Sequence, residues 1–181
     1  NVANDISGIV SEVDVKEGQN VRKGDLLFRL DEEPYRIARD AAEAQLGIVA
    51  NQLIAAKANY AQARAQIEQA KADLDFYAKT RARQSDLLDR KVTTQAAADQ
   101  AQRDYLGAQS RLVGARRQVD SLLAQLGGKP DQPVEKYAQY EQAKATLDKA
   151  DRDLRRTRVI APVDGVATNV AQVQPGNYIA A

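Results

Sequence analysis

The chain contains 181 residues, which is the length of about one ordinary domain. It has no cysteine and no histidine, which excludes disulfides, thiolate metal sites and histidine-based catalysis. The 26 basic and 25 acidic residues leave a net charge of +1, which argues against general attraction to nucleic acid or acidic membranes. Aromatic residues make up only 5% and charged residues 28%, a composition that favours long helices over a thick core.

The first thirty residues have the pattern of short strands. From Ile6 onward, apolar residues alternate with polar ones at a period near two, which indicates half-buried strands. Glycines interrupt the alternation where turns are expected. The apolar members of the pattern are Val13, Val15, Leu26, Phe28 and Leu30.

A helical segment follows, from about Pro34 to Thr157. It starts with acidic residues and a proline, both of which favour a helix N-terminus. Large apolar residues then recur every seven positions, mostly with alanine three positions later, which predicts coiled-coil seams between closely spaced helices. The first series is Leu46, Leu53, Tyr60, Ile67, Leu74 and Leu88, interrupted by Arg81. The second series is Ala98, Tyr105, Leu112, Val119 and Leu126, resuming at Tyr140, Leu147 and Leu154.

The C-terminal segment repeats the strand pattern of the N-terminal one. Either segment alone is too short to cover its own apolar face, because units of two or three strands are marginal in water. We therefore expect the two ends of the chain to complete each other. With one inserted residue, the corresponding pairs are Gly8 with Gly165, Val13 with Val170, Gly18 with Gly176 and Val21 with Ile179.

The heptad frame predicts that the helical segment turns back on itself. Ten residues separate Leu88 from Ala98, so the frame shifts by three near the midpoint of the segment. A turn there also brings the two β ends together, whereas one continuous helix would separate them. The prediction is an antiparallel hairpin with arms of about 85 Å at 1.5 Å per residue. Its parts are an ascending arm over 34–90, a tip over 89–94, and a descending arm over 94–126 and 134–157 with a break at 127–133.

These segments resemble the HlyD-type membrane fusion proteins, the periplasmic adaptors of bacterial efflux and secretion systems. Residues 21–31 with Pro34 and Tyr35 are similar to the family's first lipoyl half, and residues 158–166 are similar to its second half. The interruption over 127–135 is most similar to the EmrA-like branch. The resemblance implies a mixed α and β fold, in which a long antiparallel coiled-coil hairpin is inserted into a split lipoyl, or barrel-sandwich hybrid, β-domain. The implied boundaries are 1–33 for the first half, 34–157 for the hairpin and 158–181 for the second half.

The same resemblance implies a connective function without enzymatic activity, catalytic residues, metal or cofactor. The expected partners are an inner-membrane transporter, for which a major-facilitator exporter is one candidate class, and a TolC-like outer-membrane channel. Self-association as a trimer or hexamer is also expected, and binding of nucleic acid is not. Because the chain has no methionine and begins at Asn1, we expect it to be part of a longer periplasmic protein. A membrane anchor is expected before Asn1, and further domains are expected after Ala181.

The predicted tip carries the candidate partner-binding residues Arg83, Leu87 and Thr94. They match the spacing of the family's tip motif of Arg, Leu and Ser, with a threonine that keeps the hydroxyl. A planar guanidinium and a hydroxyl can satisfy carbonyls and carboxylates on a partner, and a leucine adds apolar contact. The alternative is a solvated Arg83, a seam residue at Leu87 and an N-cap at Thr94. The tip is also locally basic, with a net charge of +3 over Lys79, Arg81, Arg83, Arg90 and Lys91 against Asp86 and Asp89.

Two other functions remain as alternatives, a lipoyl or biotinyl carrier domain and a coiled-coil scaffold without a role in transport. A carrier presents its lysine at the turn that joins its two halves, and the helical segment occupies that place here, so Lys16 does not fit the role. Gly107 and Gly114 lie one heptad apart and off the seam. They either mark a face where a neighbouring hairpin packs closely or are simply tolerated in a stable helix.

Overall fold

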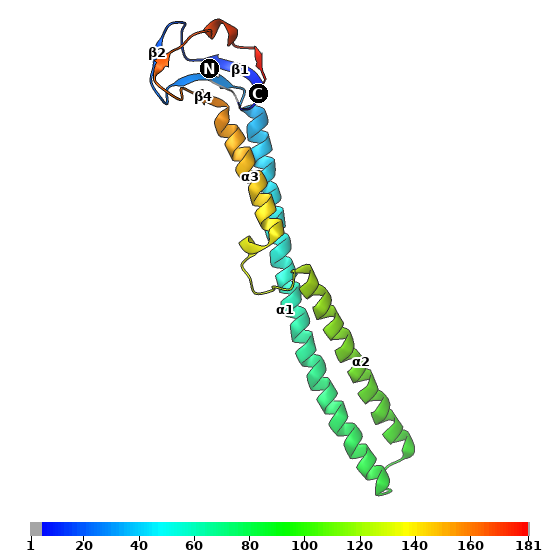
Figure 1. The fold of residues 1–181 in the computed structure, drawn as a ribbon. Coiled ribbons are helices and arrows are strands. Elements are labelled where there is room, and N and C mark those ends of the chain that lie inside the picture. The colour runs from blue at the N-terminus through cyan, green and yellow to red at the C-terminus, as the bar shows by residue number, and fades with distance from the viewer. Residues whose placement is uncertain (1–4, 181) are drawn as a thin grey trace. The chain divides into compact units, whose positions relative to one another are not determined.

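The computed structural model describes residues 5–180 (Figure 1). The chain divides into two units, one formed by Asn1–Val49 with Ala138–Ala181 and the other by Ala50–Tyr137. The first unit contains the strands and the second contains most of the helical hairpin. The predicted mixed α and β fold class is therefore confirmed. Among residues 5–180, no helix is both long and apolar enough to cross a membrane.

Two small sheets make up the β part of the first unit. The larger is antiparallel with the strand order β4-β3-β1-β6, and the smaller pairs β2 with β5. In both sheets, therefore, strands from the two ends of the chain pair with each other. The strands are β1 (Gly8–Val13), β2 (Asn20–Val21), β3 (Leu26–Leu30), β4 (Arg158–Ile160), β5 (Gly165–Val166) and β6 (Tyr178–Ile179).

The two halves of the β-domain are related by an internal two-fold repeat. In the predicted correspondence β1 matches β5 and β2 matches β6, so the pairs β1·β6 and β2·β5 are equivalent. Gly18 and Gly176 both adopt positive φ, +79° and +91°, at equivalent turns where a side chain would be strained. Four backbone hydrogen bonds form two equivalent couples: Gly18 N to Ala167 O (2.8 Å) with Gly176 N to Val10 O (2.8 Å), and Ala167 N to Gln19 O (2.8 Å) with Val10 N to Asn177 O (2.9 Å).

The β-domain core is built from both ends of the chain. Its buried members are Ile6, Val10, Val21, Leu27, Phe28, Leu30, Val159 and Ala161. The period near two that was predicted over residues 26–30 is broken at Leu27, because Leu27 and Phe28 are both buried while Leu26 is half-buried. A register shift between Leu26 and Phe28 opposite β4 explains this, since a bulge inserts one extra residue and re-aims its side chain.

The helices are α1 (Glu33–Asp89), α2 (Gln95–Gln125) and α3 (Ala138–Arg156), with a short 3-10 helix η1 (Val134–Lys136). In the second unit, α1 and α2 lie side by side and antiparallel (Figure 1). The seam residues named above are buried or half-buried in all three helices. The descending arm differs from expectation after the break, because residues 134–136 form a 3-10 turn and Tyr137 is extended, so α3 begins at Ala138.

The break between α2 and α3 is an ordered loop. Gly128 N donates to Leu123 O (2.9 Å), which closes the end of α2. The Tyr137 hydroxyl donates to Lys129 O (2.7 Å), and Lys57 Nζ of α1 donates to Gln132 O (2.8 Å). Burial, followed by the nearby charge of Asp131, raises the pKa of Tyr137, so its hydroxyl keeps its proton at neutral pH. The hydrogen bond from Lys57 holds the loop against α1, and the other two contacts fix the backbone of the loop itself.

The thin seam gives a graded prediction for stability. Leu112→Ala should lower the free energy of unfolding by about 2–5 kcal/mol, because Leu112 is buried in the seam. Ile67 is only half-buried, so Ile67→Ala should lower it by about 1–2 kcal/mol. Chemical denaturation followed by circular dichroism measures both values. A loss below about 0.5 kcal/mol for Ile67→Ala, the range of surface substitutions, would place Ile67 outside the seam.

The shared β core predicts the effect of removing one half. A chain that ends at Thr157 lacks β4, β5 and β6, so the first half loses the partners that bury its apolar face. The amides of Val10 and Val13 should then exchange rapidly with solvent, while circular dichroism should still show the hairpin helices. Hydrogen exchange read by NMR is the direct measurement. Unchanged protection of these two amides would contradict the mutual dependence of the halves.

Candidate partner-binding site at the hairpin tip

The tip is a short loop with a fixed backbone. Lys91 N donates to Leu88 O and Val92 N donates to Leu87 O, both at 2.8 Å, and Lys91 adopts a left-handed φ of +60°. This pair of bonds is the Schellman closure, which satisfies carbonyls at the end of α1 and reverses the chain direction. Val92 is 70% exposed, so the loop carries an apolar side chain into solvent.

Thr94 is the N-cap of α2. Its Oγ1 accepts a hydrogen bond from Ala97 N at 3.3 Å, which satisfies one of the free amides at the helix N-terminus. The neighbouring Thr93 hydroxyl bonds to Gln84 Oε1 (3.2 Å) and ties the loop to α1. Thr94 is exposed, and an accepting hydroxyl keeps its own O–H as a donor. The capping role and a partner contact are therefore compatible.

Arg83 and Leu87 lie one helical turn apart on α1, so they share one face of the helix. Arg83 is exposed and forms no ion pair within residues 5–180, whereas Leu87 is half-buried. In that same range no hydrogen bond or ion pair connects Arg83, Leu87 and Thr94 to one another. The three predicted residues therefore stand at one end of the hairpin as separate contact groups.

Ion pairs reduce the number of tip cations that are free to contact a partner. Arg90 pairs with Asp86 (3.0 Å) and Lys79 pairs with Asp75 (2.5 Å), each one helical turn away. Arg81 lies over the aromatic ring of Tyr105 on α2, within the seam. Among the tip cations, only Arg83 and Lys91 have no ion pair or ring contact within the described part of the chain. Recognition of an acidic partner would therefore fall to these two side chains.

The interruption of the seam at Arg81 is filled by a contact with an aromatic ring. The Arg81 guanidinium carbon lies 4.1 Å from the ring centroid of Tyr105 on α2. A reciprocal contact places Arg111 of α2 at 5.9 Å from the ring of Tyr77 on α1. Cation and ring attract each other within about 6 Å, so the Arg81–Tyr105 pair replaces an apolar seam layer and the Arg111–Tyr77 pair supports it from the rim of the seam. They also fix which residues of α2 lie opposite which residues of α1.

A groove of about 650 Å³ lies between α1 and α2 next to the tip loop. Its polar lining residues are Arg81, Ser85, Asp86, Asp89, Gln95, Asp99 and Gln102. Part of this lining is already paired, because Asp99 accepts from Gln95 Nε2 at 2.8 Å and Asp86 accepts from Arg90. The groove could not be predicted from the sequence. Its lining comes from both α1 and α2, and the sequence does not say which residues of one helix lie opposite which residues of the other.

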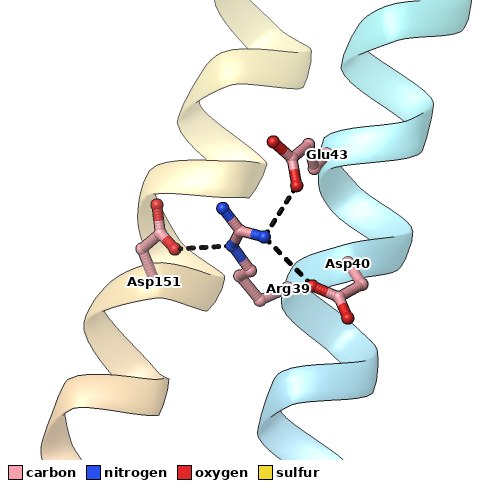
Figure 2. A network of polar contacts seen from close by, with 4 residues as sticks. All are labelled: Arg39, Asp40, Glu43 and Asp151. Carbon is pink, nitrogen blue, oxygen red and sulfur yellow. Dashed lines mark hydrogen bonds and ion pairs between the residues drawn. The ribbon is translucent and has the colours of Figure 1, made fainter.

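In the first unit, an arginine network connects α1 to α3 (Figure 2). Arg39 Nε donates to Asp151 Oδ1 of α3 at 3.2 Å. Its Nη1 donates to Glu43 (2.7 Å) and Asp40 (3.0 Å) of its own helix. The hydrogen bonds to Asp40 and then Asp151 raise the pKa of Arg39. The network holds α1 and α3, which lead to the two β halves, next to each other. Its role is structural.

Comparison with known proteins identifies the family. The family model for the RND MFP barrel-sandwich hybrid domain matches residues 1–181. The chain belongs to this membrane fusion protein family. The expected barrel-sandwich domain with an inserted hairpin is thereby confirmed as the fold of this membrane fusion protein.

One curated relative agrees with the expected EmrA-like branch, and one solved structure supports the fold. The Colistin resistance protein EmrA of Acinetobacter baumannii is 31% identical over an alignment of 181 residues, which covers 96% of this chain and 51% of that protein. The chain thus spans about half the length of this curated relative. The solved structure of the periplasmic adaptor protein EmrA is 14% identical with a TM-score of 0.50. That match covers 99% of this chain and 68% of the other and supports the fold.

The capping role of Thr94 can be measured separately from any partner contact. Thr94→Ala should lower the free energy of unfolding by about 1 kcal/mol, because Ala97 N loses its acceptor. Thr94→Ser should keep most of that stability, since the hydroxyl remains. Denaturation of the two variants under identical conditions provides the comparison. Equal losses in both variants would assign the effect to the threonine methyl group.

Proposed function

We propose that this membrane fusion protein is a periplasmic adaptor, anchored to the inner membrane, that links an exporter to an outer-membrane channel through its hairpin tip. The observation that carries the proposal is the tip itself. The tip presents two cations that form no ion pair within residues 5–180, Arg83 on the last turns of α1 and Lys91 in the loop, and the loop also exposes the apolar Val92. Such a surface suits contact with another protein better than it suits catalysis or nucleic-acid binding.

The tip residues have distinct roles in this proposal. The Arg83 guanidinium offers several donors in one plane to carboxylates or carbonyls of a channel loop. Leu87 adds apolar contact that acts mainly by slowing dissociation, whereas exposed charge mainly affects encounter rate and salt sensitivity. The free O–H of Thr94 can donate to a partner carbonyl while its oxygen caps α2.

Family membership supports the remaining partners of this proposal. The exporter is an inner-membrane transporter, with a major-facilitator type as one candidate class, and the channel is TolC-like. Several copies of the adaptor, three or six, surround the conduit. The carrier alternative is disfavoured because β3 ends at Leu30 and α1 begins at Glu33, so helix occupies the place of a carrier's lysine turn.

Export by variants of the full-length protein tests the tip. Arg83→Asp, Leu87→Ser and Thr94→Asp should each impair export of the compounds to which a deletion strain becomes sensitive. Thr94→Asp is informative because aspartate is also a good N-cap, so helix stability is preserved while a charge is added. Arg152→Asp on α3 is the matched control for charge reversal, since Arg152 is exposed and lies on a helix that does not form the tip.

The variants must also be compared at equal abundance in the membrane and equal helicity. Export at the wild-type level by all three tip variants would show that the channel is not engaged through this tip. Impaired export by Arg152→Asp to the same degree would instead point to a general effect of charge.

A further inference from the structure

We propose that Arg81 is a positioning residue for the hairpin tip. It selects one register of α2 against α1, the register in which the tip loop closes, and it disfavours registers that are shifted by one heptad. Arg81 acts on partner binding through the placement of Thr94 and does not itself touch the partner. This inference deepens the proposed function, and the part of it that concerns export rests on that function.

The seam between α1 and α2 repeats every seven residues, so its apolar packing is compatible with more than one register. Counting one heptad from the Arg81–Tyr105 contact places Leu74 of α1 opposite Leu112 of α2. A shift of α2 by one heptad brings Leu74 opposite Tyr105 in one direction and opposite Val119 in the other. Large residues face large residues in all three cases, so hydrophobic burial distinguishes these registers only weakly.

Arg81 breaks this equivalence, because it is the one charged residue in the large-residue series of α1. In the described register, its guanidinium carbon lies 4.1 Å from the ring centroid of Tyr105, which gives the half-buried charge an attractive partner. One heptad away, the same count places Arg81 opposite Ala98 or Leu112, neither of which has a ring or a polar side chain. A charge that faces apolar side chains loses solvent without gaining a partner. A single polar residue at a seam position fixes the register of a coiled coil in this way, at a cost in stability.

Two further contacts exist only in the described register. The Thr93 hydroxyl bonds to Gln84 Oε1 at 3.2 Å, and the Arg111 guanidinium carbon lies 5.9 Å from the ring centroid of Tyr77. A shift of one heptad moves α2 by about 10 Å along α1, since a helix rises 1.5 Å per residue, and separates both pairs. The tip loop does not prevent such a shift, because residues 90–94 reach about 17 Å when extended. The register therefore depends on side-chain contacts between the helices.

The register also decides whether the tip residues form one surface. Arg83 and Leu87 lie on α1, whereas Thr94 caps α2, so the alignment of the two helices places Thr94 relative to the other two. A shift of about 10 Å exceeds the length of a side chain. A partner surface that fits the three residues in the closed tip therefore does not fit them after the shift.

A direct partner contact by Arg81 is the alternative, because Arg81 also lines the groove beside the tip loop. Its guanidinium is half-buried and already lies over Tyr105, whereas Arg83 is exposed and forms no ion pair within residues 5–180. This placement favours a role inside the hairpin. The exchange variant, which combines Arg81→Tyr with Tyr105→Arg, distinguishes the two roles. It keeps a cation opposite a ring but removes the arginine from position 81.

Engineered cysteines report the register, because the chain has none of its own. In the full-length protein in its native membrane, Ala70→Cys with Ala115→Cys joins two seam positions that face each other in the described register. Ala63→Cys with Ala115→Cys, and Ala70→Cys with Leu122→Cys, join positions displaced by one heptad in either direction. After equilibration in a thiol–disulfide buffer, mass spectrometry of the monomer band from a non-reducing gel measures each disulfide. The first pair should give by far the highest yield.

Substitution of Arg81 should redistribute these disulfides. Arg81→Leu should lower the yield of the 70–115 disulfide and raise that of a displaced pair several-fold, since the residue that selects the register is gone. The exchange variant should restore the original yields. Arg64→Leu is the matched control, because Arg64 is an exposed arginine of α1 outside the seam, and it should change nothing. Unchanged yields with Arg81→Leu, or the same change with Arg64→Leu, would overturn the proposed role.

Stability and export separate positioning from packing and from direct contact. Arg81→Leu should raise the midpoint of chemical denaturation, because leucine continues the apolar seam, and should nevertheless lower export by the full-length protein. A fall in stability would make Arg81 an ordinary packing residue and would overturn the inference. The exchange variant should restore export. A restored register without restored export would show that a partner contacts Arg81 directly, which also overturns the inference.

The failure of this inference is distinguishable from the failure of the proposed function, because the disulfide yields do not depend on export. Displaced disulfides together with normal export in Arg81→Leu would overturn the link between register and tip and leave the adaptor function standing. Normal export by all three tip variants would reject channel binding by the tip, and with it the export part of this inference. The disulfide yields would still support or overturn the selection of the register by Arg81.

Discussion

The exchange of strands between the two chain ends is the constraint on which the rest of the structure depends. β1 pairs with β6 and β2 pairs with β5, so neither end has a complete apolar face of its own. Everything between them must leave the β-domain and return to it. Antiparallel helices satisfy this requirement, and the Arg39–Asp151 contact fixes α1 against α3 where they join the strands. The hairpin thus follows from the split domain. Its two arms are held together where they join the strands, by the Arg39–Asp151 contact.

The hairpin seam is thin, so polar and aromatic contacts determine its alignment. Alanines at one seam position allow close approach of the helices but bury little apolar area per layer. Such a seam specifies register weakly, since one alanine layer resembles the next. The Arg81–Tyr105 and Tyr77–Arg111 contacts break this degeneracy near the tip, and Lys57 with Gln132 does so beside the break. Specific contacts therefore determine the axial alignment of the helices, which hydrophobic burial alone does not determine.

Periodicity made the architecture predictable, whereas contacts between distant segments were not. The heptads placed the turn, and the overlay of the two ends anticipated the strand exchange. The bulge at Leu27, the stacking of Arg81 and the ion pair between Arg39 and Asp151 each depend on a partner more than twenty residues away. The late start of α3 has a similar cause, because the Tyr137 hydroxyl is held by Lys129 O. The tip residues could be named from spacing, but not which tip cations remain unpaired.

The distribution of paired charge along the hairpin suits molecules that stand next to one another. Side-by-side copies with a strongly charged surface would repel, and this chain, with a net charge of +1, has its carboxylates and cations interspersed. Local pairs such as Lys79 with Asp75 and Lys71 with Glu68 neutralise the sides of the helices. At the tip, Arg83 and Lys91 form no ion pair with any residue between 5 and 180. Under the proposed function, the neutral sides of the hairpin can meet copies of the same chain without repulsion, while its basic end can meet a partner of opposite charge.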